Sequence, residues 1–105
     1  MAIKISDDHL KNFIGGDWIV SSSDVSEAVP NPATGEVIAH VPISNRKDLD
    51  QAIVVAKEAF KSWSKTPVPR RARILFKYQQ LLVDHWEQLA KLITQANGKS
   101  YKEAY

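Results

Sequence analysis

The stretch from Ala52 to Leu82, AIVVAKEAFKSWSKTPVPRRARILFKYQQLL, decides how this chain folds because it holds two amphipathic segments separated by two prolines. On both sides of the break, apolar residues recur at spacings of three and four, which is the period of an α-helix. Pro67 and Pro69 cannot lie in a helix interior, so the first helix must end before them. Pro69 fits the first turn of the next helix, where its missing N–H costs little. The stretch therefore predicts two consecutive α-helices.

The first of these helices is expected to begin a few residues upstream of Ala52. Ser44 or Asn45 can cap it, and Asp48 in its first turn suits the positive end of a helix. Its apolar stripe follows the helical period over Leu49, Ala52, Ile53, Ala56, Ala59, Phe60 and Trp63. These residues predict one face that packs against other parts of the protein.

The second helix carries two apolar lines rather than one. One line comprises Ala72, Leu75, Phe76, Gln79, Leu82 and Val83, and the other comprises Ile74, Tyr78 and Leu81. A helix that is apolar on two sides is expected to lie between other elements. Asp84 followed by Glu87 resembles a capping box and predicts that a third helix starts there. Asn97 and Gly98 form a good stop signal for that helix.

The last residues predict the beginning of a fourth helix. Ser100 and Glu103 have the spacing of another capping box. The sequence stops at Tyr105, within two turns of this start, and a helix that short is not stable alone. We therefore expect the chain to be a piece of a longer one, with the remainder of that chain as its partner.

Extended segments precede the helices. Two short apolar runs flank Gly15 and Gly16, and a Gly-Gly pair readily supplies the positive φ angles of a tight hairpin. A second pair of extended segments is predicted around Val25–Val29 and Val37–Val41, with the turn-forming sequence NPATG between them. Pro42 lacks an N–H, so the last strand should end there or lie at an edge.

These elements define the expected organisation. Residues 1–10 are predicted to be an N-terminal tail, residues 11–43 a β-hairpin region and residues 44–105 a helical region. The fold is therefore β-hairpins followed by about three α-helices and the start of a fourth.

Composition excludes several classes of function. The chain has 105 residues, of which 44% are hydrophobic, and its formal net charge is only +2, from 14 Lys and Arg against 12 Asp and Glu. Such a mild excess does not predict a nucleic-acid partner. The absence of cysteine excludes a disulfide, a thiolate zinc site and a cysteine nucleophile within these residues. No signal peptide and no membrane-spanning run is present, so we expect a cytoplasmic protein without a membrane partner.

The histidines are weak candidates for a site. Asp7, Asp8 and His9 could be considered as metal ligands, but adjacent polar residues near a terminus are more often a mobile tail. His40 lies in a predicted strand and His85 at a helix junction. Neither can be paired with a nucleophile from the sequence, so both are interpreted as structural or solvated.

Three arginines at the start of the second helix are the strongest candidate for binding. Arg70, Arg71 and Arg73 could meet an anionic partner, because guanidinium binds phosphate in a bidentate manner. A free-standing α+β module that binds such a partner is therefore one hypothesis. The alternative is structural: successive helix positions point about 100° apart, so the three side chains cannot all face one ligand. In that case one or two would pair with acidic residues of neighbouring elements or of packed subunits.

Five segments in this order resemble the start of the NAD-dependent aldehyde dehydrogenases: NFIGGDWIVS (12–21), VPNPATGEVIAHVP (29–42), DLDQAIVVAKEAFKSWS (48–64), RRARILFKYQQLL (70–82) and LAKLITQANGKSYKEA (89–104). The NPATGEV turn and the NGK element are general to that superfamily. TPVPRRARILFKYQQLL is more specific and resembles the CoA-acylating branch that acts on methylmalonate semialdehyde or malonate semialdehyde. Two positions depart from the usual pattern: Gly15 where asparagine is usual, and Ala96 where this branch usually has glutamate.

The resemblance implies an α/β parent enzyme with the aldehyde dehydrogenase fold, in which residues 44–105 belong to the NAD-binding domain. Such a parent oxidises a semialdehyde with NAD, loses carbon dioxide and transfers the acyl group to CoA. It also implies a homo-oligomer. The nucleophilic cysteine, the glutamate base, the oxyanion hole, the NAD site and the arginines for the substrate carboxylate would lie outside residues 1–105. We therefore expect no catalytic, cofactor-binding or metal-binding residue in this segment, and neither NAD nor CoA bound to it.

Overall fold

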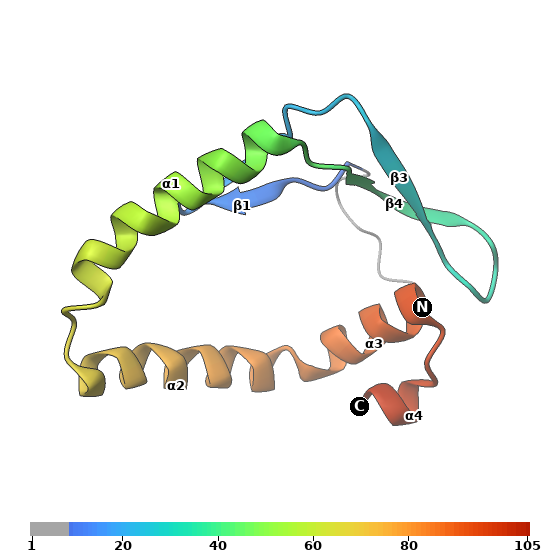
Figure 1. Ribbon diagram of the computed structural model, residues 1–105. Coiled ribbons are helices and arrows are strands. Elements are labelled where there is room, and N and C mark those ends of the chain that lie inside the picture. The colour runs from blue at the N-terminus through green and yellow to red at the C-terminus, as the bar shows by residue number, and fades with distance from the viewer. Residues whose placement is uncertain (1–8) are drawn as a thin grey trace. The chain divides into compact units, whose positions relative to one another are not determined.

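A computed structural model describes residues 9–105, which form four strands and four helices (Figure 1). In chain order these are β1 (Asn12–Ile14), β2 (Asp17–Ile19), β3 (Ser26–Pro30), β4 (Val37–Pro42), α1 (Arg46–Trp63), α2 (Val68–Asp84), α3 (Trp86–Asn97) and α4 (Tyr101–Ala104). The described residues divide into two compact units. One unit contains residues 9–29 and 37–65, and the other contains residues 30–36 and 66–105.

The first hairpin confirms the prediction made from the two glycines. Strands β1 and β2 pair antiparallel, and Ile14 lies opposite Asp17 across a two-residue loop. In that loop Gly15 has φ 66° and Gly16 has φ 92°. Positive φ at both loop positions is the requirement of a type I′ turn, whose twist matches that of the strands.

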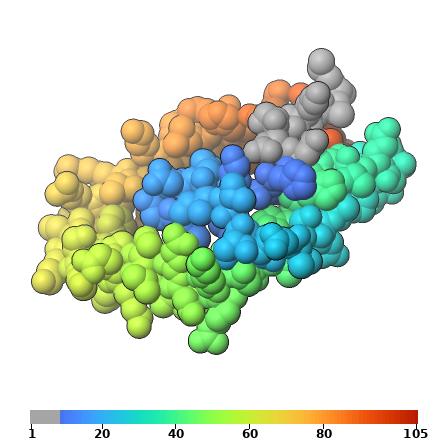
Figure 2. All heavy atoms as spheres, turned by 90° about the horizontal axis from the view of Figure 1, so that it is seen from above, coloured from blue at the N-terminus to red at the C-terminus, as the bar shows by residue number. Residues whose placement is uncertain are grey.

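This hairpin packs on α1 within the first unit, as Figure 2 shows for the blue and green segments. A Cβ atom added at Gly15 would lie 3.3 Å from Cγ1 of Val55, so the loop approaches the helix closely. The side-chain amide of Asn12 donates a hydrogen bond of 2.9 Å to Oγ of Ser44, just before the helix begins. The hairpin is therefore attached to α1 at its loop and at its first strand.

Strands β3 and β4 form the second two-stranded sheet. Strand β4 ends at Pro42, as predicted, and contains Ala39, which is only 2% exposed. The segment before β1 also meets this sheet. The backbone N–H of Leu10 donates to the carbonyl of His40 at 2.9 Å, and His9 forms an isolated parallel bridge with His40.

The boundaries of the first two helices follow the sequence signals. The side chain of Asn45 caps α1 by accepting a hydrogen bond from the N–H of Asp48. Helix α1 ends at Trp63, before the two prolines, and α2 begins at Val68 with Pro69 in its first turn. None of the helices within residues 9–105 is both long and apolar enough to cross a membrane.

The predicted start of the third helix was wrong, although its predicted end was right. Asp84 is still the last residue of α2, and its carboxylate accepts a hydrogen bond of 2.8 Å from the side chain of Gln80. It therefore does not cap α3, whose N-cap position is His85 and has no side-chain cap. Gly98 ends α3 in the left-handed conformation with φ 79°.

The fourth helix begins as the second capping box predicts. Ser100 occupies the N-cap position of α4, and its side chain accepts a hydrogen bond from the N–H of Glu103. The same hydroxyl donates 2.7 Å to the Glu103 carboxylate. Both partners of this capping box are therefore engaged with each other.

The apolar core of the described residues is very small. Ala39 and Ala90 are the buried hydrophobic residues within 9–105, and α2 contains no buried residue. Both apolar lines of α2 remain open to solvent, with Phe76 68% exposed and Tyr78 58% exposed. Nothing in residues 9–105 covers α2 on two sides, so the predicted neighbours of this helix stay a prediction.

Candidate functional site

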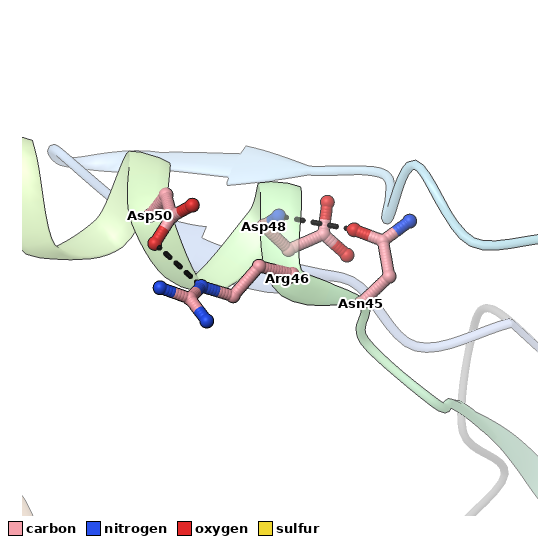
Figure 3. Close-up of polar contacts among 4 residues, drawn as sticks. All are labelled: Asn45, Arg46, Asp48 and Asp50. Atoms are coloured by element: carbon pink, nitrogen blue, oxygen red, sulfur yellow. Dashed lines mark hydrogen bonds and ion pairs between the residues drawn. The ribbon is translucent and has the colours of Figure 1, made fainter.

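The most connected polar cluster joins the serine loop after β2 to the start of α1. The Asp48 carboxylate accepts hydrogen bonds from the hydroxyl of Ser21, from the backbone N–H of Ser22 at 2.9 Å and from the hydroxyl of Ser22 at 2.8 Å. Asn45 Oδ1 accepts from the N–H of Asp48 at 3.1 Å, as Figure 3 shows. We call these four residues the serine–aspartate cap.

This cluster determines the ionisation of Asp48. The side chain is almost fully enclosed, at 6% exposure. The hydrogen bond from the Ser21 hydroxyl is the largest influence that lowers the pKa of Asp48 from 3.8 to about 2. The two bonds from Ser22 act in the same direction, while burial opposes them. Asp48 is therefore a firmly ionised carboxylate at neutral pH.

The chemistry available to the serine–aspartate cap is structural. A carboxylate with a pKa near 2 is a poor proton acceptor at neutral pH. Three donors from Ser21 and Ser22 also occupy its oxygens. The cap therefore fixes the loop of residues 20–25 on the positive end of α1 and supplies no catalytic base.

The arginine cluster does not form a binding site within the described residues. Arg70 and Arg73 are exposed and Arg71 is half-buried. Within residues 9–105, the structure shows no hydrogen bond or ion pair from any of these three guanidinium groups, and Nε of Arg71 is buried without a partner. The expected acidic neighbours are therefore not found in this part of the chain, and no observation favours an anion-binding module.

The candidate histidines contact neighbouring residues of the fold and do not form a site together. Asp7 and Asp8 lie outside the described residues, and the ring of His9 stacks on that of His40 with centroids 5.0 Å apart. Nδ1 of His85 lies 2.8 Å from the carbonyl oxygen of Leu81, at the junction between α2 and α3. Across residues 9–105, no group of three or more His, Asp or Glu side chains is arranged to hold a metal ion.

Comparison with known proteins gives a consistent family assignment. A sequence model of the aldehyde dehydrogenase family matches residues 18–105. Malonate-semialdehyde dehydrogenase of Halalkalibacterium halodurans is 71% identical over 105 residues, which is 100% of this chain and 22% of the relative. Malonate-semialdehyde dehydrogenase 1 of Geobacillus thermodenitrificans is 75% identical over 96 residues, 91% of this chain and 20% of that relative.

Solved structures agree in fold. A structure described as a methylmalonate-semialdehyde dehydrogenase of Sinorhizobium meliloti 1021, in complex with NAD, aligns with TM-score 0.89 and 36% identity. The alignment covers 93% of this chain and 20% of that one. A mutant of aldehyde dehydrogenase C from Pseudomonas syringae, in complex with NAD+ and octanal, aligns with TM-score 0.92 and 35% identity, over 99% of this chain and 21% of that one.

The chain thus spans about a fifth of the length of the curated relatives that it matches. Within that span the agreement is continuous, because the family match runs through the β3–β4 turn, all four helices and the NGK element. The resemblance inferred from the sequence motifs is confirmed, and the chain belongs to the aldehyde dehydrogenase family.

Proposed function

We propose that this chain is the N-terminal segment of an enzyme that oxidises malonate semialdehyde, or its methyl derivative, with NAD. In the proposed reaction the substrate also loses carbon dioxide and its acyl group passes to CoA. The observation that carries the proposal is the 71% identity, over all 105 residues, to a malonate-semialdehyde dehydrogenase. The NAD complexes among the structural neighbours support the choice of cofactor.

Within that enzyme, residues 1–105 would have a supporting role. They contain no cysteine, whereas this kind of aldehyde oxidation needs a thiolate to attack the carbonyl carbon. We assign no catalytic or cofactor-binding residue to the segment and place the reacting groups in the remainder of the parent chain. NAD supplies the hydride acceptor when it is bound.

The exposed apolar faces support this role. Leu75 and Phe76 on α2, and Phe60 on α1, are each more than half exposed. Large exposed apolar patches normally mark surfaces that contact another protein element. We infer that residues 44–105 form part of the NAD-binding domain, that residues 11–43 flank it as β-hairpins, and that the parent enzyme is a cytoplasmic homo-oligomer.

The activity can be tested on the protein made from the native gene. We expect NADH to form when malonate semialdehyde, NAD and CoA are supplied together, and mass spectrometry should detect acetyl-CoA. With methylmalonate semialdehyde, the corresponding product is propionyl-CoA. Omitting CoA should suppress formation of the acyl-CoA product. Absence of NADH with both semialdehydes would rule out the proposed substrate class.

A further inference from the structure

Two turns distant in the sequence meet in the second unit. The first is the NPATG turn, residues 31–35, which its own hydrogen bonds make rigid. The carbonyl of Asn31 accepts from the N–H of Gly35 at 2.7 Å, and its side-chain oxygen accepts from the N–H of Ala33 at 2.9 Å. The N–H of Asn31 donates to the carbonyl of Glu36 at 2.8 Å. These bonds fix the backbone on both sides of Pro32.

The second turn is the NGK turn, residues 97–99, where α3 ends. Gly98 has φ 79°, and its N–H donates to the carbonyl of Thr94 at 3.0 Å. A Cβ atom at Gly98 would lie only 2.9 Å from Cγ of Pro32 and 3.5 Å from its Cβ. The Pro32 ring therefore occupies space that is free only because residue 98 is glycine.

Helix α4 begins three residues after Gly98, and its N-cap residue Ser100 lies two residues after it. The N–H groups of Glu103 and Ala104 both donate to the carbonyl of Ser100, at 3.1 and 2.9 Å. At its other end, Nε1 of Trp86 donates 2.6 Å to the carbonyl of Tyr105. Hydrogen bonds therefore hold α4 at both ends, through the Ser100 cap at its start and through Trp86 at its end.

We propose that the Pro32–Gly98 contact couples the NPATG turn to α4, so that loosening the contact loosens both. The contact holds the backbone at Gly98, and Gly98 sets where Ser100 can cap the next helix. The rigid turn around Pro32 thereby fixes the direction in which the chain leaves α3. This coupling is a property of residues 9–105 and does not depend on the proposed activity.

Amide hydrogen exchange on the Pro32→Ala variant tests the coupling directly. Truncating the ring removes the contact but should leave the protein folded. We expect exchange about threefold or more faster at Glu103, Ala104 and Tyr105, together with faster exchange in residues 33–36. Pro42→Ala removes the same ring from the end of β4, in the other unit, and should leave exchange in α4 unchanged. Unchanged exchange at Glu103–Tyr105 in Pro32→Ala would overturn the proposal.

A double-mutant cycle provides an independent measurement. Gly98→Ala and Gly35→Ala carry nearly the same backbone penalty, since their φ angles are 79° and 77°, but nothing lies within 4 Å of a Cβ at Gly35. We expect Gly98→Ala to lower the equilibrium constant for folding about tenfold more than Gly35→Ala. Adding Pro32→Ala should remove most of that excess. Strict additivity of Gly98→Ala and Pro32→Ala would contradict the coupling, and if Gly98→Ala does not fold, the exchange result decides.

Discussion

Replacing Asp48 with asparagine is expected to cause the largest loss of stability of any single substitution around α1. The carboxylate accepts three hydrogen bonds from Ser21 and Ser22. An amide in its place offers one oxygen and presents an NH2 group to donors, so at least one donor loses its partner in an enclosed site. Urea unfolding at pH 7 should show a lower midpoint with little change in slope.

Two matched variants show whether the serine–aspartate cap is responsible. Asn45→Ala removes the helix cap together with the acceptor that Asn45 Oδ1 offers to the Ser22 hydroxyl at 3.0 Å, but it leaves the Asp48 carboxylate in place. It should cost about 1 kcal/mol, less than Asp48→Asn. Asp50→Asn removes an exposed carboxylate that pairs with Arg46 at 3.1 Å, and it should have little effect. If Asp48→Asn were no more destabilising than Asp50→Asn, the cap would not hold the serine loop.

The same variant has a defined pH dependence. The folded state lowers the pKa of Asp48 from 3.8 to about 2, so the ionised carboxylate stabilises the folded state above pH 3.8. This contribution is lost as the pH falls from 3.8 towards 2. The stability difference between wild type and Asp48→Asn should therefore be constant near neutral pH and shrink over that acidic interval. A difference that instead grew on acidification would contradict the assignment.

The second large effect is expected on association. The 105-residue chain should bind a hydrophobic dye, or self-associate as its concentration rises, because the apolar lines of α2 are exposed. Phe76 is 68% exposed in these lines. Phe76→Glu should lower the fluorescence of the bound dye about twofold or more, because a charged side chain resists burial. In sedimentation, a larger fraction of the protein should then run as monomer.

The control for this substitution is the adjacent exposed residue. Lys77→Glu introduces the same side chain one position along α2 and changes the net charge further, yet it leaves the apolar lines intact. It should leave dye binding close to that of the wild type. A monodisperse monomer at high concentration, with no dye binding by the wild type, would show that α2 does not present a docking surface.

Features set by adjacent residues were predictable from the sequence. The Gly15–Gly16 loop, the Asn45 cap and the Gly98 stop each depend on the conformational preference of one or two residues. The predicted start of α3 was wrong although it also rested on a local pattern. Asp84 and Glu87 have capping-box spacing, but α2 continues through Asp84. The Asp84 carboxylate accepts a hydrogen bond from Gln80 within that helix and does not cap the next one.

Long-range contacts were not predictable in the same way. Asp48 was expected in the first turn of α1, and the serine run was expected as a loop. The hydrogen bonds that join them connect residues 26 to 27 positions apart in the sequence. The local signals for these hydrogen bonds are the three consecutive serines at 21–23 and the acidic residue in the first turn of α1. The Pro32–Gly98 contact likewise joins two turns that the sequence predicts separately. The family motifs, by contrast, identified the aldehyde dehydrogenase family, because they compare residue types in order along nearly the whole chain.

A segment exchange tests most directly whether this chain is a supporting segment of a malonate-semialdehyde dehydrogenase. In the Halalkalibacterium halodurans enzyme, the matched segment, 22% of its length, would be replaced by this chain, which is 71% identical to it. NADH formation from malonate semialdehyde, NAD and CoA would then be measured. We expect kcat and KM within about threefold of the unmodified enzyme, since no reacting group has been exchanged. A chimera that assembles and binds NAD normally, but has lost turnover, would contradict this account.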